Sequence, residues 1–156
     1  MYCIISKYTY LKVLSIKQMA LVDKKLALAA VMLNGLNLQF VSEEFKADKD
    51  VVLAAVMLNG LNLQFASEEL KADKDVVLAA VTQDSNAFLY APRELLVYKE
   101  VMLAIVTQNG EMLMFASAEL KADKDVVLAA ISQNRTAIKY ASKEFRTDKD
   151  MIASSR

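Results

Sequence analysis

The chain has 156 residues, and 55% of them are hydrophobic, which is enough to form a buried core. Its 19 Lys and Arg residues balance its 19 Asp and Glu residues, so no overall charge attracts nucleic acid or an anionic membrane. It contains no histidine and a single cysteine, Cys3, which removes the commonest metal ligand and general base and leaves no partner for an internal disulfide.

Residues 1–22 differ in character from the rest of the chain. They carry Lys7, Lys12 and Lys17, no acidic residue and a dense set of apolar side chains. The lysines interrupt the uncharged block that a secretion signal needs. We expect this segment to cap the first repeat, and targeting or membrane contact is the alternative. No apolar run in the chain approaches the ~20 residues that span a bilayer.

From Asp23 onward the sequence repeats every 25 residues. The string Asp48–Val56 returns at Asp73 and, with Ile in its last place, at Asp123, and looser copies begin at Asp23, Tyr98 and Asp148. The repeats predict five units followed by a truncated sixth. Their ranges are 23–47, 48–72, 73–97, 98–122, 123–147 and 148–156. Positions 1 to 25 within each unit are counted from these first residues.

The first half of each unit predicts a helix over positions 2 to 11. Positions 4 to 9 are apolar in every full unit and are rich in Leu and Ala, which favours a helix over a strand. Asp at position 1 suits the N-cap, and Tyr98 lacks that capping group. Each glycine lies at position 13 after an Asn, which predicts a left-handed C-cap; in the third and fifth units Asp84 and Asn134 would take the positive φ instead. These glycines are Gly35, Gly60 and Gly110.

The second half of each unit predicts a shorter, split helix. Apolar side chains at positions 16, 19 and 23 share one helical face. Position 20 holds Ser or, in the third unit, Pro92, and both residue types begin helices. Two helices in 25 residues leave apolar surface uncovered, so neighbouring units must stack. We therefore expect an all-α fold, a right-handed α-solenoid of five two-helix 25-residue repeats.

The repeated unit resembles a known tandem family. The string Asp73–Val81 and the later Tyr140–Ser142 carry the resemblance, which covers residues 23–150. The family is catalogued as domain of unknown function 4116, short helical repeats of protists, algae, large viruses and intracellular bacteria. The resemblance implies modular stacking and contact with other macromolecules, and it supplies no catalytic residues.

Two places depart from the repeat towards apolar residues. Around the turns of the first two units, apolar side chains replace polar ones where the family typically has Thr-Gln or Ser-Gln. We expect residues 1–22 to cover these side chains, and the alternative is that they form a candidate interaction patch on the surface. The patch residues are Met32, Leu33, Leu36, Met57, Leu58 and Leu61. A secondary patch, or else a junction that packs differently, comprises Leu89, Leu96, Val97 and Tyr98.

Three further series of residues recur in every unit. Lysines at position 2 have acids at positions 1 or 3, which favours paired surface charges over a phosphate-binding ladder. Glutamates at position 22 repeat too regularly for an active site, which needs one asymmetric cluster. Aromatic rings at position 18 could stack on bases, but we expect them to pack in the core.

The sequence thus favours a non-enzymatic repeat scaffold that mediates protein–protein interaction. We expect no catalytic residues, no cofactor and no metal. The partner is expected to be another protein, and the chain a monomer or weak homo-oligomer. The alternative is an RNA-binding helical repeat protein, which the balanced charge disfavours. A cytoplasmic location is expected, with secretion as an effector and organelle targeting left open.

Overall fold

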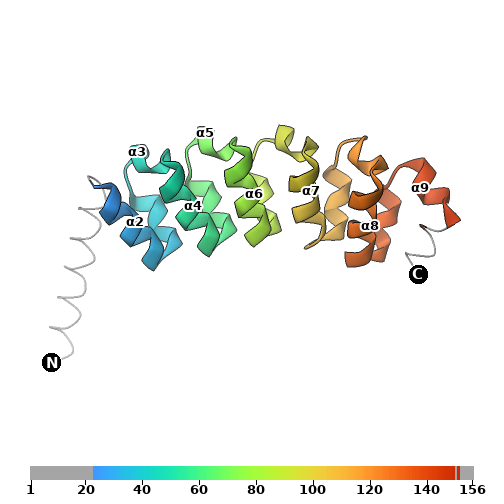
Figure 1. Cartoon of the computed structure of the whole chain (residues 1–156), viewed down its shortest axis with the longest axis horizontal. Helices are drawn as coiled ribbons and strands as arrows, with labels where there is room; N and C mark the ends of the chain where they lie inside the picture. Colours follow the sequence, from blue (N-terminus) through green and yellow to red (C-terminus); the bar gives the residue numbers. More distant parts are fainter. Residues whose placement is uncertain (1–22, 150, 152–156) are drawn as a thin grey trace, which may run out of the picture.

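The computed structural model describes residues 23–149 and 151. All regular structure in these residues is helical, without any strand among them. The helices form tandem repeats that lie side by side in one row (Figure 1). The expected cap at 1–22 and most of the expected truncated unit at 148–156 lie outside the described residues.

A helix of eight to ten residues begins every unit, as predicted. Asp at position 1 caps it: Asp48 Oδ1 accepts the backbone N–H groups of Asp50 (3.0 Å) and Val51 (3.3 Å). Tyr98 makes no side-chain cap bond, as its residue type predicts. These helices are α2 (Lys24–Leu33), α4 (Lys49–Leu58), α6 (Lys74–Gln83), α7 (Lys99–Val106) and α8 (Lys124–Gln133).

The core lies on one face of these first helices. Positions 4, 5, 8 and 9 are buried, as in Val51, Val52, Ala55 and Val56, because this spacing gathers four side chains on one side of a helix; the exception is Leu26 of the first unit, which is exposed. Each helix packs against the next: α4 contacts both α2 and α6. Positions 6 and 7, although equally apolar in sequence, are only partly buried against this core and form the open side of the layer.

The predicted left-handed cap at the glycines is wrong. Among the described residues, no residue of any type has a positive φ. Asn59 is extended and its Oδ1 accepts the N–H of Leu61 (2.9 Å), so it begins the next helix directly. The glycine is needed for close approach between units. A Cβ on Gly60 would lie 2.2 Å from the carbonyl oxygen of Ala80.

The second half of each unit is split, as predicted, but its first part is a 3-10 helix that begins at position 13. The 3-10 helices are η1 (Gly35–Phe40), η2 (Gly60–Phe65), η3 (Ser85–Tyr90), η5 (Gly110–Phe115) and η7 (Arg135–Tyr140). A break follows, and a short helical turn ends each unit. These turns are α3 (Glu43–Lys46), α5 (Glu68–Lys71), η4 (Arg93–Val97), η6 (Leu120–Ala122) and α9 (Lys143–Thr147).

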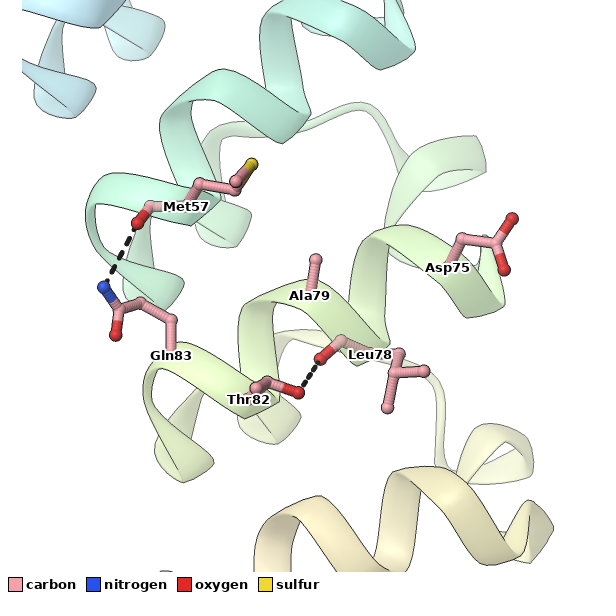
Figure 2. A pocket seen from close by; sticks show the side chains of 6 residues that line it. All are labelled: Met57, Asp75, Leu78, Ala79, Thr82 and Gln83. Atoms are coloured by element: carbon pink, nitrogen blue, oxygen red, sulfur yellow. Dashed lines mark hydrogen bonds between the residues drawn. The ribbon is translucent and has the colours of Figure 1, made fainter.

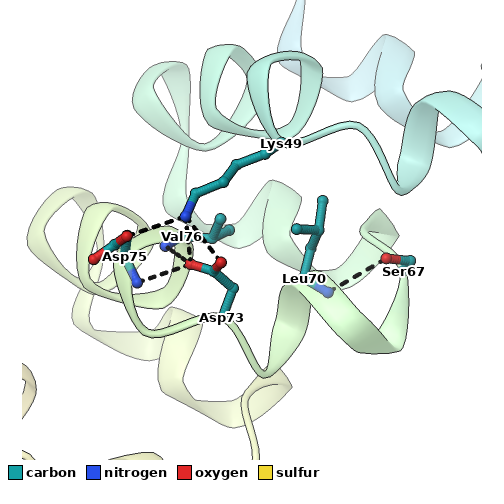
Figure 3. A network of polar contacts seen from close by, with 6 residues as sticks. All are labelled: Lys49, Ser67, Leu70, Asp73, Asp75 and Val76. Carbon is teal, nitrogen blue, oxygen red and sulfur yellow. Dashed lines mark hydrogen bonds and ion pairs between the residues drawn. The ribbon is translucent and has the colours of Figure 1, made fainter.

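A ladder of ion pairs joins consecutive units. Lys49 Nζ lies 2.9 Å from Asp73 Oδ2 and 3.0 Å from Asp75 Oδ2 of the following unit, while Asp73 also caps α6 (Figure 3). The same contact recurs from Lys24 and Lys99. The position-2 lysines of the first four units therefore bind the next repeat, which agrees with the prediction of paired charges and adds that the pairing is between units.

The junction between the third and fourth units is built differently. At the other junctions between full units, a glycine at position 13 lies against the backbone carbonyl of the alanine at position 8 of the next unit. Here Ser85 stands in place of the glycine and Ile105 in place of the alanine. Tyr98 replaces the capping aspartate, and its ring lies 4.6 Å from Lys74 Nζ, which also pairs with Glu100 at 3.2 Å. Three departures from the repeat thus fall together at a single interface.

The ladder makes stability depend on pH. Burial raises the pKa of the Asp73 carboxyl, but hydrogen bonds from Lys49 and from the Val76 backbone N–H outweigh it, and its pKa lies below the ordinary value. Hydrogen bonds to Asp73 and Asp75 raise the pKa of Lys49. The carboxylate contribution is therefore present above about pH 4 and lost as the pH falls towards the lowered pKa. The lysine contribution is present below about pH 10 and lost as the pH rises through the raised pKa.

Substitution of Asp73 separates its two roles. Asp73→Ala removes both cap and charge and should lower the free energy of unfolding by about 1 kcal/mol. Asp73→Asn keeps an oxygen that can cap the helix, so its free energy of unfolding at about pH 7 should fall by less than that of Asp73→Ala. Because the Asn side chain does not titrate, lowering the pH from about 7 to about 3 should destabilise this variant less than it destabilises the wild type. Urea denaturation at the two pH values checks this. Equal losses from both variants at neutral pH would contradict the capping role.

Candidate interaction surface

The candidate interaction patch is exposed on the ends of α2 and α4. Met32 and Leu33 are 68% and 78% exposed, and Met57 and Leu58 are 69% and 52% exposed. The two helices pack side by side, so their ends lie next to each other. Leu36 is also exposed, whereas Leu61 is half-buried.

The polar residue that the patch replaces at position 11 has a structural role. Gln83 Nε2 donates to the backbone carbonyl of Met57 in the preceding unit (3.1 Å). Gln133 Oε1 accepts the N–H of Gly110 (2.6 Å), and Gln108 makes both kinds of contact with the third unit. Leu58 cannot make these bonds to the first unit. The patch therefore exposes leucine where other junctions gain hydrogen bonds.

Leu58→Gln should therefore stabilise the protein. The new amide can reach back to the first unit, as Gln83 does to the second, and one added hydrogen bond contributes about 0.5–1.5 kcal/mol. Leu33→Gln is the matched control, because no repeat helix precedes α2 in the described part of the chain. Urea denaturation of both variants measures the difference. An equal gain from Leu33→Gln would contradict a contact between units as the cause.

A groove lies between α4 and α6 and shares Met57 with the patch. It has a volume of about 480 Å³ and is lined by Met57, Asp75, Leu78, Ala79, Thr82 and Gln83. Figure 2 shows Met57 and Ala79 on the two sides of the groove, with Asp75 near the first turn of α6 and Gln83 in its last turn. The groove thus has an apolar floor, an acid at one end and an amide at the other.

The secondary patch is not one surface. Leu89, Val97 and Tyr98 are exposed, but Leu96 is 7% exposed and belongs to the core, so its assignment to a surface patch is wrong. Leu96 replaces the Lys or Arg that other units have at position 24, and its burial adds apolar contacts at this junction. The Tyr98 ring is engaged by Lys74.

The aromatic rings at position 18 are more exposed than predicted. The side chains of Phe40, Tyr90 and Phe115 are 43%, 36% and 39% exposed, whereas Phe65 and Tyr140 are partly buried against the core. Position 18 follows the buried position 16 by two residues, which places it about 120° away around a 3-10 helix, so the ring lies beside the core and not within it.

Neither a metal-binding cluster nor a membrane-spanning helix occurs among the described residues. No group of three His, Cys, Asp or Glu side chains between residues 23 and 149 could hold a metal ion. None of the described helices is long and apolar enough to cross a membrane. The expectations about residues 1–22 as cap or targeting segment lie outside the described residues.

One comparison with known proteins gives a match. The family model described as "Domain of unknown function (DUF4116)" matches residues 23–65, 48–96 and 98–146, which together cover more than half of the chain. No curated protein matches the chain. No solved structure matches it either.

Proposed function

Because the chain belongs to the DUF4116 family of repeats, whose description names no activity, we propose its function from its surface: a non-enzymatic scaffold that binds another protein. We further propose that residues 23–147 form five repeats in a right-handed α-solenoid, with a sixth repeat beginning at 148. The capped helices that recur at 25-residue intervals support this arrangement.

The observation that carries the proposal is the exposed Met-Leu pair at the end of each of the first two helices. Met32, Leu33, Met57 and Leu58 stay largely open to solvent although a polar residue at position 11 would add hydrogen bonds. Contiguous exposed apolar side chains typically mark an interaction site, and methionine adapts to partners of different shape. The scaffold thus forgoes stability at this surface, which supports a role in binding.

RNA binding is the second candidate, and one observation favours it. Phe40, Tyr90 and Phe115 expose part of their rings, which could stack on bases. The charges argue against it, since Lys24, Lys49, Lys74 and Lys99 all face carboxylates of the next unit. Retention of a labelled single-stranded RNA that weakens with salt would support this candidate. We expect no such retention.

The proposal is tested by comparing two matched double variants in a pull-down from cell extract. Met32→Asp/Met57→Asp places charges in the patch at position 10 and should abolish recovery of the partner. Thr107→Asp/Ser132→Asp places the same charges at exposed position-10 sites of the fourth and fifth units and should leave recovery unchanged. Both pairs add an acid near a helix C-terminus, so any general loss of stability is matched. Equal recovery by the two variants would refute the patch assignment.

A further inference from the structure

The groove between α4 and α6 is a hollow on the open side of the first-helix layer. Its volume of about 480 Å³ lies within the range of pockets that hold ligands. Leu78 and Ala79 contribute its apolar surface, and Met57 brings it into contact with the candidate interaction patch. An occupant of the groove would therefore also meet the patch.

The apolar surface continues along neighbouring units. Leu53 and Ala54, and likewise Leu103 and Ala104, occupy positions 6 and 7 and are only partly buried against the core. Because adjacent first helices pack side by side, these pairs form a strip across α4, α6 and α7. A strip of this kind suits an apolar helix face laid across several units.

The charges along one edge of the strip are unbalanced. Positions 1 to 3 of the five units hold eight carboxylates and six lysines. Beside the groove, Lys49 alone faces both Asp73 and Asp75, and the Asp75 side chain is 78% exposed. The edge therefore keeps a negative surplus, although the whole chain is neutral. The opposite end, at Thr82 and Gln83, carries no charge.

We propose that the groove and strip bind a basic amphipathic helix of the partner protein, with its apolar side chains in the groove and Lys or Arg side chains facing Asp75. This inference rests on the proposed function and names the chemistry of the partner. Apolar burial would supply most of the affinity, and the acidic edge would set the orientation and favour a cationic helix over an acidic one.

The experiment titrates the full-length protein with two synthetic amidated helical peptides of about 14 residues. One consists of leucine and lysine in an amphipathic pattern, and the other has glutamate in place of each lysine. Fluorescence anisotropy should show about tenfold or more tighter binding of the basic peptide, weakening as salt is added. Equal binding of the two peptides, or no binding of either, would overturn the proposal.

Three variants locate the binding. Thr82→Arg fills the mouth of the groove with a cation and should weaken the basic peptide about tenfold, whereas Asp75→Asn should weaken it about threefold. Glu68→Gln is the matched control: Glu68 is an exposed acid paired with one lysine, as Asp75 is, but it lies on α5 outside the groove. Equal weakening by Glu68→Gln would show non-specific attraction and overturn the proposal.

Two further outcomes separate this inference from its premise. If neither peptide binds while Met32→Asp/Met57→Asp still loses the partner, the groove assignment fails and the scaffold function stands. Residues 1–22 are themselves basic and apolar, so they are a competing occupant. If Lys7→Glu/Lys12→Glu/Lys17→Glu in the full chain tightens peptide binding, the groove is held by this segment and the partner assignment is overturned.

Discussion

Gly110→Ala should lower the free energy of unfolding by about 1–3 kcal/mol, the usual cost of forcing extra volume into a packed interior. The new Cβ would lie 2.2 Å from the carbonyl oxygen of Ala130 and 3.1 Å from its carbonyl carbon, both backbone atoms of the following helix. Backbone cannot turn aside as a side chain can, so the units must move apart. Gly60→Ala, facing Ala80, should cost a similar amount.

Ser85→Ala is the control for the glycine variants. Ser85 already carries a Cβ, and the junction between the third and fourth units, where Ile105 faces it, has room for that atom. We expect a change within about 0.5 kcal/mol. Urea denaturation followed by circular dichroism gives all three values. If Gly110→Ala had the same free energy of unfolding as the wild type, the fourth and fifth units could not approach each other as closely as the structure shows.

Leu63→Ala should cost about 2–5 kcal/mol, the range for deleting a large aliphatic side chain from a core. Leu63 is completely buried at position 16, where η2 packs against α4 and α6. Its removal leaves a cavity between η2 and the first helices α4 and α6. Because each unit is stabilised by its neighbours, we expect the loss to appear in the unfolding of both adjoining units.

Leu89→Ala is the matched control for Leu63→Ala. It deletes the same atoms from the next position of the following unit, where the leucine is exposed. The free energy of unfolding should change by less than about 0.5 kcal/mol. If the two substitutions cost the same, position 16 does not lie in the core, and the assignment of layers is wrong.

The local signals in the sequence predicted much of the fold. Asp48 and its equivalents marked the helix starts, the apolar run marked the helix length, and Ser67 marked the break before α5. These signals act through residues close in the chain, so a single unit contains all the information. The family resemblance was confirmed by the matching family model.

The contacts between units were harder to predict. Asn-Gly at the end of a helix is typical of a left-handed turn, and nothing local shows that Gly60 instead makes room for the Ala80 carbonyl. One sign was available: glycine at position 13 occurs only where the next unit has alanine at position 8, and Ser85 is followed by Ile105. The sequence could not show that Lys49 pairs with Asp73 and Asp75 of the next unit, because Asp48 and Asp50 flank it within its own unit and are equally plausible partners.

The candidate site could be predicted only in part, because it too depends on contacts between units. Departures from the repeat pointed to Met57 and Leu58, whose side chains are exposed, while their role as an interaction site stays a prediction. The same argument failed for Leu96, which is buried because its junction packs differently. The groove beside Asp75 could not be predicted, since Leu78 and Ala79 belong to an apolar run whose exposed side depends on the neighbouring helices.

Site-specific photo-crosslinking tests most directly the claim that the candidate interaction patch binds a protein. A benzophenone amino acid would replace Leu33, the most exposed patch residue, and in a second sample Ser132, an exposed residue of the fifth unit. Irradiation in cells should yield a discrete protein adduct from position 33 and none from position 132. Adducts from position 132 alone, or the same adducts from both positions, would contradict this account.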